Sequence, residues 1–196
     1  MSIAFLCSNS QSSLLQRIFA ERHDLSDHIS SVISTNSQFS HTYLPKHTHY
    51  SYFQWNSRNE GSRILSTLLR EHSPSVLIAL FDKIIDLSFF IDSECCLLNL
   101  HPSLLPSFKG MHAYDDSIDA GVTINGATLH EIDVAVDSGK ILGQVAYAFD
   151  PFRPSQEQLH IKHMSEYFLI TSYLSSYLGI SAPVTSPVDC ICSLAS

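Results

Sequence analysis

The chain has 196 residues, of which 44% are hydrophobic and 15% charged, and its formal net charge is −8. This composition is typical of a folded globular protein, and the length predicts one domain with a sizeable core. The negative charge argues against a nucleic-acid partner, which needs a basic face, and no apolar run approaches the roughly 20 residues of a membrane span. We therefore expect no nucleic acid and no membrane as partner.

The first half of the chain alternates apolar runs with amphipathic patterns. We expect strands at residues 2–7, 29–33, 76–80 and 96–99. A helix is predicted after the capping pair Ser12-Ser13, and a second one over residues 58–71, where leucine and isoleucine recur at helical spacing. Residues 35–55 are polar and aromatic and predict a long loop.

The second half predicts a short helix over residues 111–120, strands over 127–132 and 141–147, and a long helix over 155–178. In the long helix the residues expected to face inward are Leu159, Met164, Phe168 and Leu174. Strands alternating with helices predict an α/β fold, a Rossmann-like, mostly parallel sheet flanked by helices. The expected domain covers residues 1–180, and the Ser/Pro-rich residues 181–196 are expected to form a loose tail.

The cysteines are odd in number and irregularly spaced: Cys7, Cys95, Cys96, Cys190 and Cys192. This pattern argues against a disulfide framework and predicts a reducing, cytoplasmic location. No Cys-x-x-Cys pair is present, and no carboxylate or cysteine accompanies His41, His47 and His49. We therefore expect no metal site.

Two short segments carry the polar residues best suited to chemistry. Asn99 ends the fourth predicted strand and His101 follows two residues later, so alternation places both on the same side if the chain stays extended. Open α/β sheets keep their chemistry at the carboxyl ends of their strands. Asp137 follows a later strand that contains His130. An amide, an imidazole and a carboxylate together suit acyl transfer without a covalent nucleophile.

These residues belong to a longer pattern, which consists of Asn99-Leu100-His101-Pro102-Ser103-Leu104-Leu105-Pro106, Gly110, Gly126-Ala127-Thr128-Leu129-His130 and Asp137-Ser138-Gly139. In order and spacing it resembles the folate-dependent formyltransferase family, both its glycinamide ribonucleotide transformylase-like and its sugar N-formyltransferase-like members. The match is close over residues 75–144. The resemblance implies the formyltransferase fold and N10-formyltetrahydrofolate as co-substrate. It also implies that Asn99 and His101 bind an oxyanion, and that Asp137 is the partner of His101 and the proton relay.

Each motif also has a plain structural interpretation. Asn99 could cap a turn, and residues 137–139 could form only a hairpin turn between two strands. Their joint occurrence at the family's spacing favours catalysis. His130, within a strand pattern, is expected to be a structural, hydrogen-bonded histidine, and Ser103, Gly110 and Thr128 are expected to be scaffold for the loop.

The resemblance also implies a donor site. Residues 80–85 align with the family segment that holds the pterin by backbone contacts and an apolar wall, and residues 132–136 align with the other side of that pocket. The residues implied are Leu80, Phe81, Lys83, Ile84, Ile85, Ile132, Asp133, Val134 and Ala135. Family members often have Gly-Phe-Met-Arg-Ile at residues 80–84, but backbone contacts tolerate the change.

The acceptor site departs from the purine-pathway member of the family. There a glycine-rich loop after the first strand cradles the substrate phosphate, whereas this chain has no glycine before Gly61. We expect the acceptor to meet Ser10, Ser12, Ser13 and Lys162. Lys162 could instead form a solvated pair with Glu166. The aromatic residues of segment 35–55 could recognise a nucleotide, but packing against the domain is the favoured interpretation.

We therefore expect an N10-formyltetrahydrofolate-dependent N-formyltransferase that acts on the primary amine of a small, nucleotide-linked amino sugar. The alternative is glycinamide ribonucleotide transformylase of purine biosynthesis. A formyltetrahydrofolate hydrolase is disfavoured because such enzymes usually carry an extra N-terminal regulatory domain, whereas the first predicted strand begins at residue 2. A catalytically silent binding protein is disfavoured because Asn99, His101 and Asp137 are intact. The expected partner is a small-molecule amine, and the expected state is a monomer or homodimer.

Overall fold

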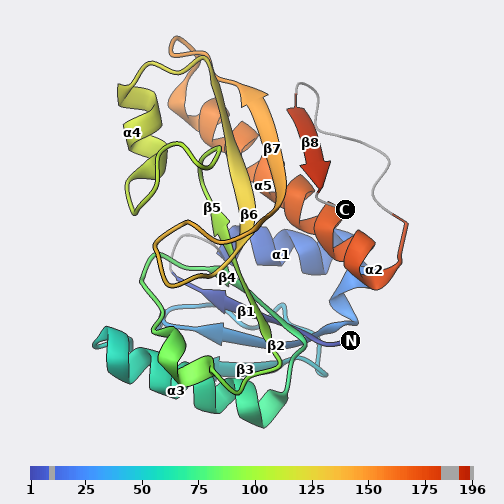
Figure 1. Cartoon of the computed structure of the whole chain (residues 1–196). Helices are drawn as coiled ribbons and strands as arrows, with labels where there is room; N and C mark the ends of the chain where they lie inside the picture. Colours follow the sequence, from blue (N-terminus) through green and yellow to red (C-terminus); the bar gives the residue numbers. More distant parts are fainter. Residues whose placement is uncertain (9–11, 182–189, 195–196) are drawn as a thin grey trace. The chain divides into compact units, whose positions relative to one another are not determined.

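The structure is a computed structural model that describes residues 1–8, 12–181 and 190–194 (Figure 1). The chain forms two compact units, Met1–Asn99 and Leu100–Ser196, where the sequence predicts one domain over residues 1–180. We call them the first and the second unit. Among the described residues no helix has the length and hydropathy to cross a membrane.

The first unit contains a parallel sheet in the order β3-β2-β1-β4-β5. Its strands are β1 (Ile3–Cys7), β2 (Ile29–Ser34), β3 (His49–Tyr52), β4 (Val76–Leu80) and β5 (Cys96–His101), the last of which ends in the second unit. Every residue of β1 and β4 is buried. Strands buried on both faces read as continuous apolar runs, and for this reason the sequence located them well.

The helices of this unit are α1 (Ser12–Glu21), α2 (His23–Ser26), α3 (Arg58–His72) and the 3₁₀ helix η1 (Leu87–Phe90). α3 begins after Ser57, whose Oγ accepts the Glu60 N–H at 3.2 Å, a typical N-cap. It ends at Ser73, which lies in the left-handed region with φ of 44°. The short α2 and η1 were not predicted, because a single turn leaves no periodic pattern to detect.

Segment 35–55 differs from the expected loop in one respect. Strand β3 lies inside it and pairs with β2 at the edge of the sheet, with its side chains half-buried or exposed. An exposed edge strand of four residues has no alternating apolar pattern, so no periodicity predicts it.

The aromatic residues of this segment pack on one another. The ring of Tyr50 lies between Phe39 and His41, with centroid distances of 5.6 and 4.6 Å, and Tyr43 lies 5.9 Å from Phe19 of α1. These contacts support the packing interpretation over a role in nucleotide recognition.

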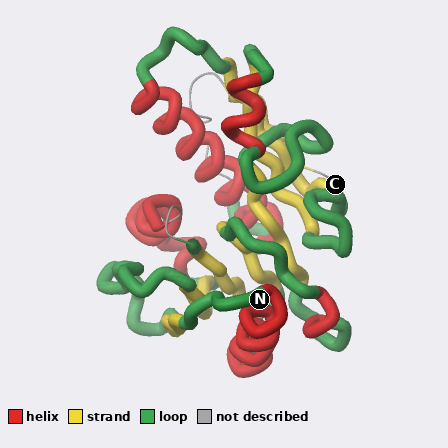
Figure 2. Tube along the Cα trace, turned by 90° about the vertical axis from the view of Figure 1, so that its left-hand side faces the viewer, coloured by secondary structure: helices red, strands yellow, loops and turns green. Residues whose placement is uncertain are grey.

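The second unit contains α4 (Ala113–Asp119), β6 (Ile124–Glu131), β7 (Ile141–Ala148), α5 (Ser155–Leu178) and β8 (Cys190–Leu194). β7 pairs antiparallel with β6 on one side and with β8 on the other. α5 packs along β6 and β7 (Figure 1 and Figure 2). Over the whole chain the strand pairs are mostly parallel and helices flank them, as the sequence predicts.

Strand β8 corrects the expectation of a loose tail. Residues 190–194 pair with Gly143–Tyr147 of β7, whose outer edge would otherwise lack a partner. The Ser/Pro-rich composition of the tail concealed this short apolar run. Residues 182–189 and 195–196 lie outside the described part of the chain.

Helix α5 begins and ends where the sequence predicts, and Gly179 closes it with φ of 68°. The predicted inward face needs correction, since Leu159 is 46% exposed. Leu174 is buried as expected, whereas Met164 and Phe168 are only half-buried. The buried residues in the first half of the helix are polar, namely Gln158, Lys162, Ser165 and Glu166. A pattern of apolar residues cannot locate a face that is covered and polar.

Candidate active site

Strand β5 supplies Asn99 and His101, which lie two residues apart and therefore point to the same side of the strand. Asn99 is half-buried, and His101 is only 4% exposed. The strand ends at His101 and is followed by Pro102, which cannot donate a backbone hydrogen bond. The predicted position at a carboxyl strand end is therefore the observed one.

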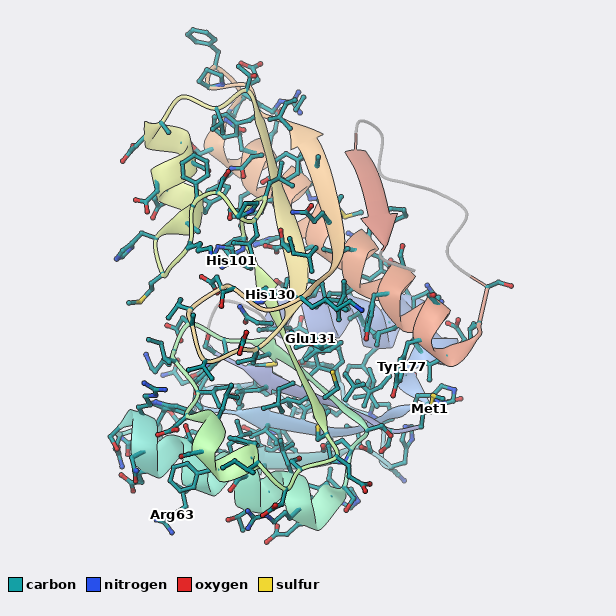
Figure 3. The ribbon with its side chains drawn as sticks, in the orientation of Figure 1. Met1, Arg63, His101, His130, Glu131 and Tyr177 are labelled. Atoms are coloured by element: carbon teal, nitrogen blue, oxygen red, sulfur yellow. The ribbon has the colours of Figure 1, made fainter. Side chains whose placement is uncertain are left out.

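The second unit brings His101 and His130 beside the carboxylate of Asp137, and we call these three residues the His–Asp cluster. Figure 3 shows the two histidines near one another. His101 Nδ1 lies 3.4 Å from Asp137 Oδ2, and His130 Nε2 lies 3.6 Å from Oδ1. The two imidazole rings meet edge to face, with centroids 6.2 Å apart. The Gly110 N–H donates to Oδ2 at 2.7 Å, so this carboxylate is hydrogen-bonded to the backbone and flanked by the two rings.

The hydrogen bond of His101 Nε2 shows which ring nitrogen carries a hydrogen. Nε2 lies 2.8 Å from the carbonyl oxygen of Phe108, which can only accept. Nε2 therefore carries hydrogen, and the ring presents Nδ1 to Asp137. The Ser103 hydroxyl also donates to the Phe108 carbonyl, at 3.0 Å, and so holds this acceptor in place.

Asp137 lies in the connection between the antiparallel strands β6 and β7, so the hairpin interpretation of this segment is structurally correct. Its φ of 48° is left-handed, a conformation that aspartate and asparagine tolerate better than most residues. Gly139 lies against β6, and a Cβ there would come within 1.9 Å of the Glu131 carbonyl oxygen. The residues that form the turn between β6 and β7 thus also place the Asp137 carboxylate.

His130 is a buried, hydrogen-bonded histidine, as the sequence analysis expects. It is 2% exposed, and its Nδ1 lies 2.8 Å from the Glu131 carbonyl. Its pKa is lowered, chiefly because burial disfavours the charged ring, although the Glu131 carbonyl and Asp137 oppose this effect. Thr128 and His130 are two residues apart in β6, so their side chains point to the same face of the strand. Because Thr128 bonds the loop that follows His101, this spacing is the sequence signal for His130 lying beside the cluster.

The predicted scaffold residues connect the loop after β5 to the hairpin. Thr128 Oγ1 donates to the Ser103 carbonyl at 2.7 Å and accepts the Leu105 N–H at 3.1 Å. Gln144 Nε2 donates to Thr128 Oγ1 at 3.0 Å and to the Leu105 carbonyl at 2.9 Å. This network fixes the loop that carries the Phe108 carbonyl and the Gly110 amide.

The residues expected to hold the folate fall in both units. In the first unit Leu80 and Ile85 are buried, Phe81 is half-buried, and Lys83 and Ile84 are exposed. In the second unit Ile132 is half-buried, whereas Asp133, Val134 and Ala135 are exposed. Val134 is 83% exposed, and a large apolar side chain left in solvent beside a polar cluster is suited to an apolar ligand.

The structure places the residues expected to bind the acceptor in different environments. Ser10 lies outside the described residues, Ser12 is the first residue of α1, and Ser13 is exposed on the same helix. Lys162 is buried, so the solvated pair with Glu166 is wrong: Nζ lies 2.6 Å from Glu166 Oε1, and the two side chains are 11% and 2% exposed. The pair is buried because α5 packs this face against the unit.

Lys162 and Glu166 belong to a larger group, the α5 polar cluster, completed by Tyr114 and Tyr147. Lys162 Nζ lies 5.5 Å from the centre of the Tyr114 ring. Burial raises the pKa of both tyrosines, and the Glu166 charge adds to the rise. Among the described residues, Glu166 Oε2 and the Tyr147 hydroxyl are buried without a hydrogen-bond partner. Such a cluster has unused capacity to bind a polar ligand.

Comparison with known proteins defines the class. Residues 1–166 match the family model described as formyl transferase, and the chain therefore belongs to the formyl transferase family. The family's formyl donor is N10-formyltetrahydrofolate, so the chain is a folate-dependent formyltransferase, which confirms the predicted enzyme class and co-substrate.

Among curated proteins, the chain is similar to the trifunctional purine biosynthetic protein adenosine-3 of Gallus gallus, with 39% identity over 94 residues, and of Homo sapiens, with 37% over 93 residues. Each match covers 47% of this chain and 9% of the relative. The aligned segment is thus less than a tenth of these larger proteins.

Solved structures match over most of the chain. The phosphoribosylglycinamide formyltransferase of Streptococcus pneumoniae has a TM-score of 0.73 and 25% identity, covering 90% of this chain and 98% of that one. The enzyme of Anaplasma phagocytophilum gives 0.73 and 26%, with coverage of 89% and 87%. A formyltetrahydrofolate deformylase of Pseudomonas syringae pv. tomato gives 0.78 at 21%, covering 91% of this chain and 61% of that one, and shares the fold. These matches confirm the formyltransferase fold.

Proposed function

We propose that this chain transfers the formyl group of N10-formyltetrahydrofolate to the primary amine of glycinamide ribonucleotide. The observation that carries the proposal is the match, over about nine tenths of the chain, to solved phosphoribosylglycinamide formyltransferases at 25% and 26% identity. The purine biosynthetic relatives at 37% and 39% identity agree with it. They favour this acceptor over the nucleotide-linked amino sugar that the sequence analysis preferred.

The reaction needs stabilisation of negative charge on the formyl oxygen. When the amine attacks the formyl carbon, the carbonyl oxygen becomes an oxyanion of a tetrahedral intermediate. In the proposed mechanism the Asn99 amide and a ring N–H of His101 donate to this oxygen. One such donor is worth about 10²–10³ in rate. For Nε2 to serve, its bond to the Phe108 carbonyl must be exchanged for the oxyanion.

The reaction also needs a base for the attacking nitrogen. Asp137 is proposed to take this proton, directly or through a water molecule, because the Gly110 N–H holds its carboxylate and the two imidazoles lie beside it. His130 donates from Nδ1 to the Glu131 carbonyl, so Nε2 of the neutral ring is an acceptor 3.6 Å from Asp137 Oδ1, where it can receive a proton that the carboxylate has taken up. When the tetrahedral intermediate collapses, the bond between the formyl carbon and N10 breaks, and the departing tetrahydrofolate nitrogen takes up the proton that left the amine.

The folate is proposed to lie against residues 80–85 and 132–135, as the family resemblance implies. Exposed apolar side chains in both segments, Ile84 and Val134 among them, support this assignment because the core does not use them. Lys162 is proposed to meet the acceptor, together with Ser10, Ser12 and Ser13. The spare oxygen of Glu166 supports it, since a donor group of the acceptor would satisfy that buried atom. The cytoplasmic location and the monomer or homodimer state stay predictions.

One assay separates the candidate reactions. The full chain is incubated with N10-formyltetrahydrofolate and glycinamide ribonucleotide, an amino-sugar nucleotide, or no amine, and both tetrahydrofolate and the formylated product are measured. We expect product with glycinamide ribonucleotide. Formylation of the amino sugar alone would overturn the proposed acceptor, and equal tetrahydrofolate release without amine would identify a hydrolase.

A further inference from the structure

The chain has a single tryptophan, Trp55, between β3 and α3. Its half-buried ring meets the ring of Phe81 edge to face, with centroids 4.8 Å apart and an interplanar angle of 63°. Phe53 lies on another side, at 5.9 Å. Phe81 is the residue directly after β4, so Trp55 supports the start of the segment 81–86.

The indole of Trp55 also packs against Gly61 of α3, where a side chain would leave no room for the ring. A Cβ on this residue of α3 would lie 2.4 Å from Trp55 Cδ2 and 2.6 Å from Cε2. Carbon atoms never approach so closely, so any larger residue would displace the indole. Gly61 is itself buried, which means that the indole forms its cover. The ring is held between a helix surface and Phe81.

The neighbouring residue holds the other end of the same segment. The buried Ser62 Oγ accepts the backbone N–H of Asp86 at 2.8 Å. Two consecutive residues of α3 thus fix both ends of segment 81–86, one through the indole and one by a direct hydrogen bond. Between these ends, Ile84 is exposed to solvent.

We propose that Trp55, seated on Gly61, is a positioning residue for the formyl donor. The inference rests on the proposed function, in which residues 80–85 hold the folate largely through their backbone. A segment fixed before the ligand arrives avoids the cost of ordering it on binding. Within the described part of the first unit the aromatic rings beside Trp55 are those of Phe53 and Phe81, so we expect its effect on donor affinity.

Steady-state kinetics with both substrates test whether Trp55 affects donor affinity alone. Trp55→Ala is expected to raise KM for N10-formyltetrahydrofolate roughly three- to tenfold, the size of one aromatic contact, with kcat and the acceptor KM unchanged within about twofold. Gly61→Ala is expected to act in the same direction, because it displaces the indole. Trp55→Phe is expected to recover most of the donor affinity, and Gln54→Ala, an exposed neighbour, serves as the matched control.

Fluorescence gives a second readout, since Trp55 is the chain's one indole. A non-transferable folate analogue is expected to change the emission of the wild type on binding, and Gly61→Ala is expected to shift the emission of the free protein. Circular dichroism checks folding. If Trp55→Ala does not fold, Trp55→Leu replaces it, because this change also removes the ring contact with Phe81.

The outcomes are distinguishable. Folded Trp55→Ala and Gly61→Ala variants that keep the wild-type donor KM would overturn the inference and leave the proposed function standing. Equal changes in kcat and in both KM values would show a general structural role and would also overturn it. A wild type that neither binds nor turns over the folate would overturn the proposed function and the inference together.

Discussion

The two units differ in the kind of polar side chain that they bury. Among the described residues of the first unit, the buried polar ones are serines and threonines, whereas the second unit buries His101, His130, Lys162 and Glu166. Burying a serine or threonine hydroxyl costs little free energy when it forms a hydrogen bond. Burying an ionisable group costs much more unless a partner compensates its charge. A protein keeps such groups where it needs them for function. The comparison therefore supports the proposal that the acid–base chemistry belongs to the second unit, whereas the first unit is built by apolar packing.

The strongest test of this contrast is Asp137→Asn. Asparagine tolerates the left-handed backbone at this position and can still accept the Gly110 N–H, so the change removes the charge and little else. We expect kcat to fall by about 10²–10⁴, the typical contribution of a positioned proton acceptor. Tetrahydrofolate release measures it, with Asp119→Asn on the exposed end of α4 as the control. A loss below tenfold would contradict the relay.

The second test removes one half of the buried pair in α5. Lys162→Met leaves the Glu166 carboxylate buried without its cation, and we expect unfolding in urea to become easier by about 3–5 kcal/mol. The double variant Lys162→Met with Glu166→Gln should recover a large part of this loss, because no charge then remains buried. If the single variant lost less than about 1 kcal/mol, the pair would be solvated and the contrast between the units would weaken.

The third test uses pH. Burial lowers the pKa of His130 and of His163 below the ordinary value near 6.5, so the unfolded chain binds more protons than the folded one below that pH. Stability should consequently fall as the pH drops from 7 towards 5, and these two groups should add no slope above pH 7. His130 alone can contribute at most about 1.4 kcal/mol per pH unit.

Urea unfolding at several pH values measures this slope. His163→Gln should flatten it, whereas His23→Gln, a change at an exposed position of the first unit, should leave it as it is. A slope unaltered by His163→Gln would mean that this histidine is not held neutral by the fold.

The smallest effect is expected in the first unit. Ser57→Ala removes the N-cap of α3 and should lower the free energy of unfolding by about 1 kcal/mol, with kcat unchanged. Thermal unfolding and the formyl-transfer assay check both parts. A marked loss of kcat would show that α3 takes part in more than holding segment 81–86.

The sequence predicted those parts of the fold that local pattern determines. Helix α5 has its expected ends because Pro154 precedes it and Gly179 follows it, and strand β4 has its expected ends because it is apolar throughout. The motif spacing also anticipated that His101 and Asp137 lie together, which the 3.4 Å distance bears out. Their catalytic roles stay a proposal.

Other features depend on contacts between distant residues and left no local signal. Lys162 is buried because Glu166 neutralises it and Tyr114, from a different helix, covers it, so a pattern that assigns lysine to solvent fails. Strands β3 and β8 exist because β2 and β7 offer them unpaired edges. The seat of Trp55 on Gly61 requires the fold that brings the start of α3 under the preceding segment.

Strand β8 has a practical consequence for handling the protein. It covers the edge of β7 from Gly143 to Tyr147, so a shortened chain ending at Gly179 would present a row of free backbone amides and carbonyls. Such an edge recruits strands from other molecules. Trimming the Ser/Pro-rich end to help crystallisation would therefore promote self-association, and an affinity tag is better attached beyond residue 194 than substituted for it.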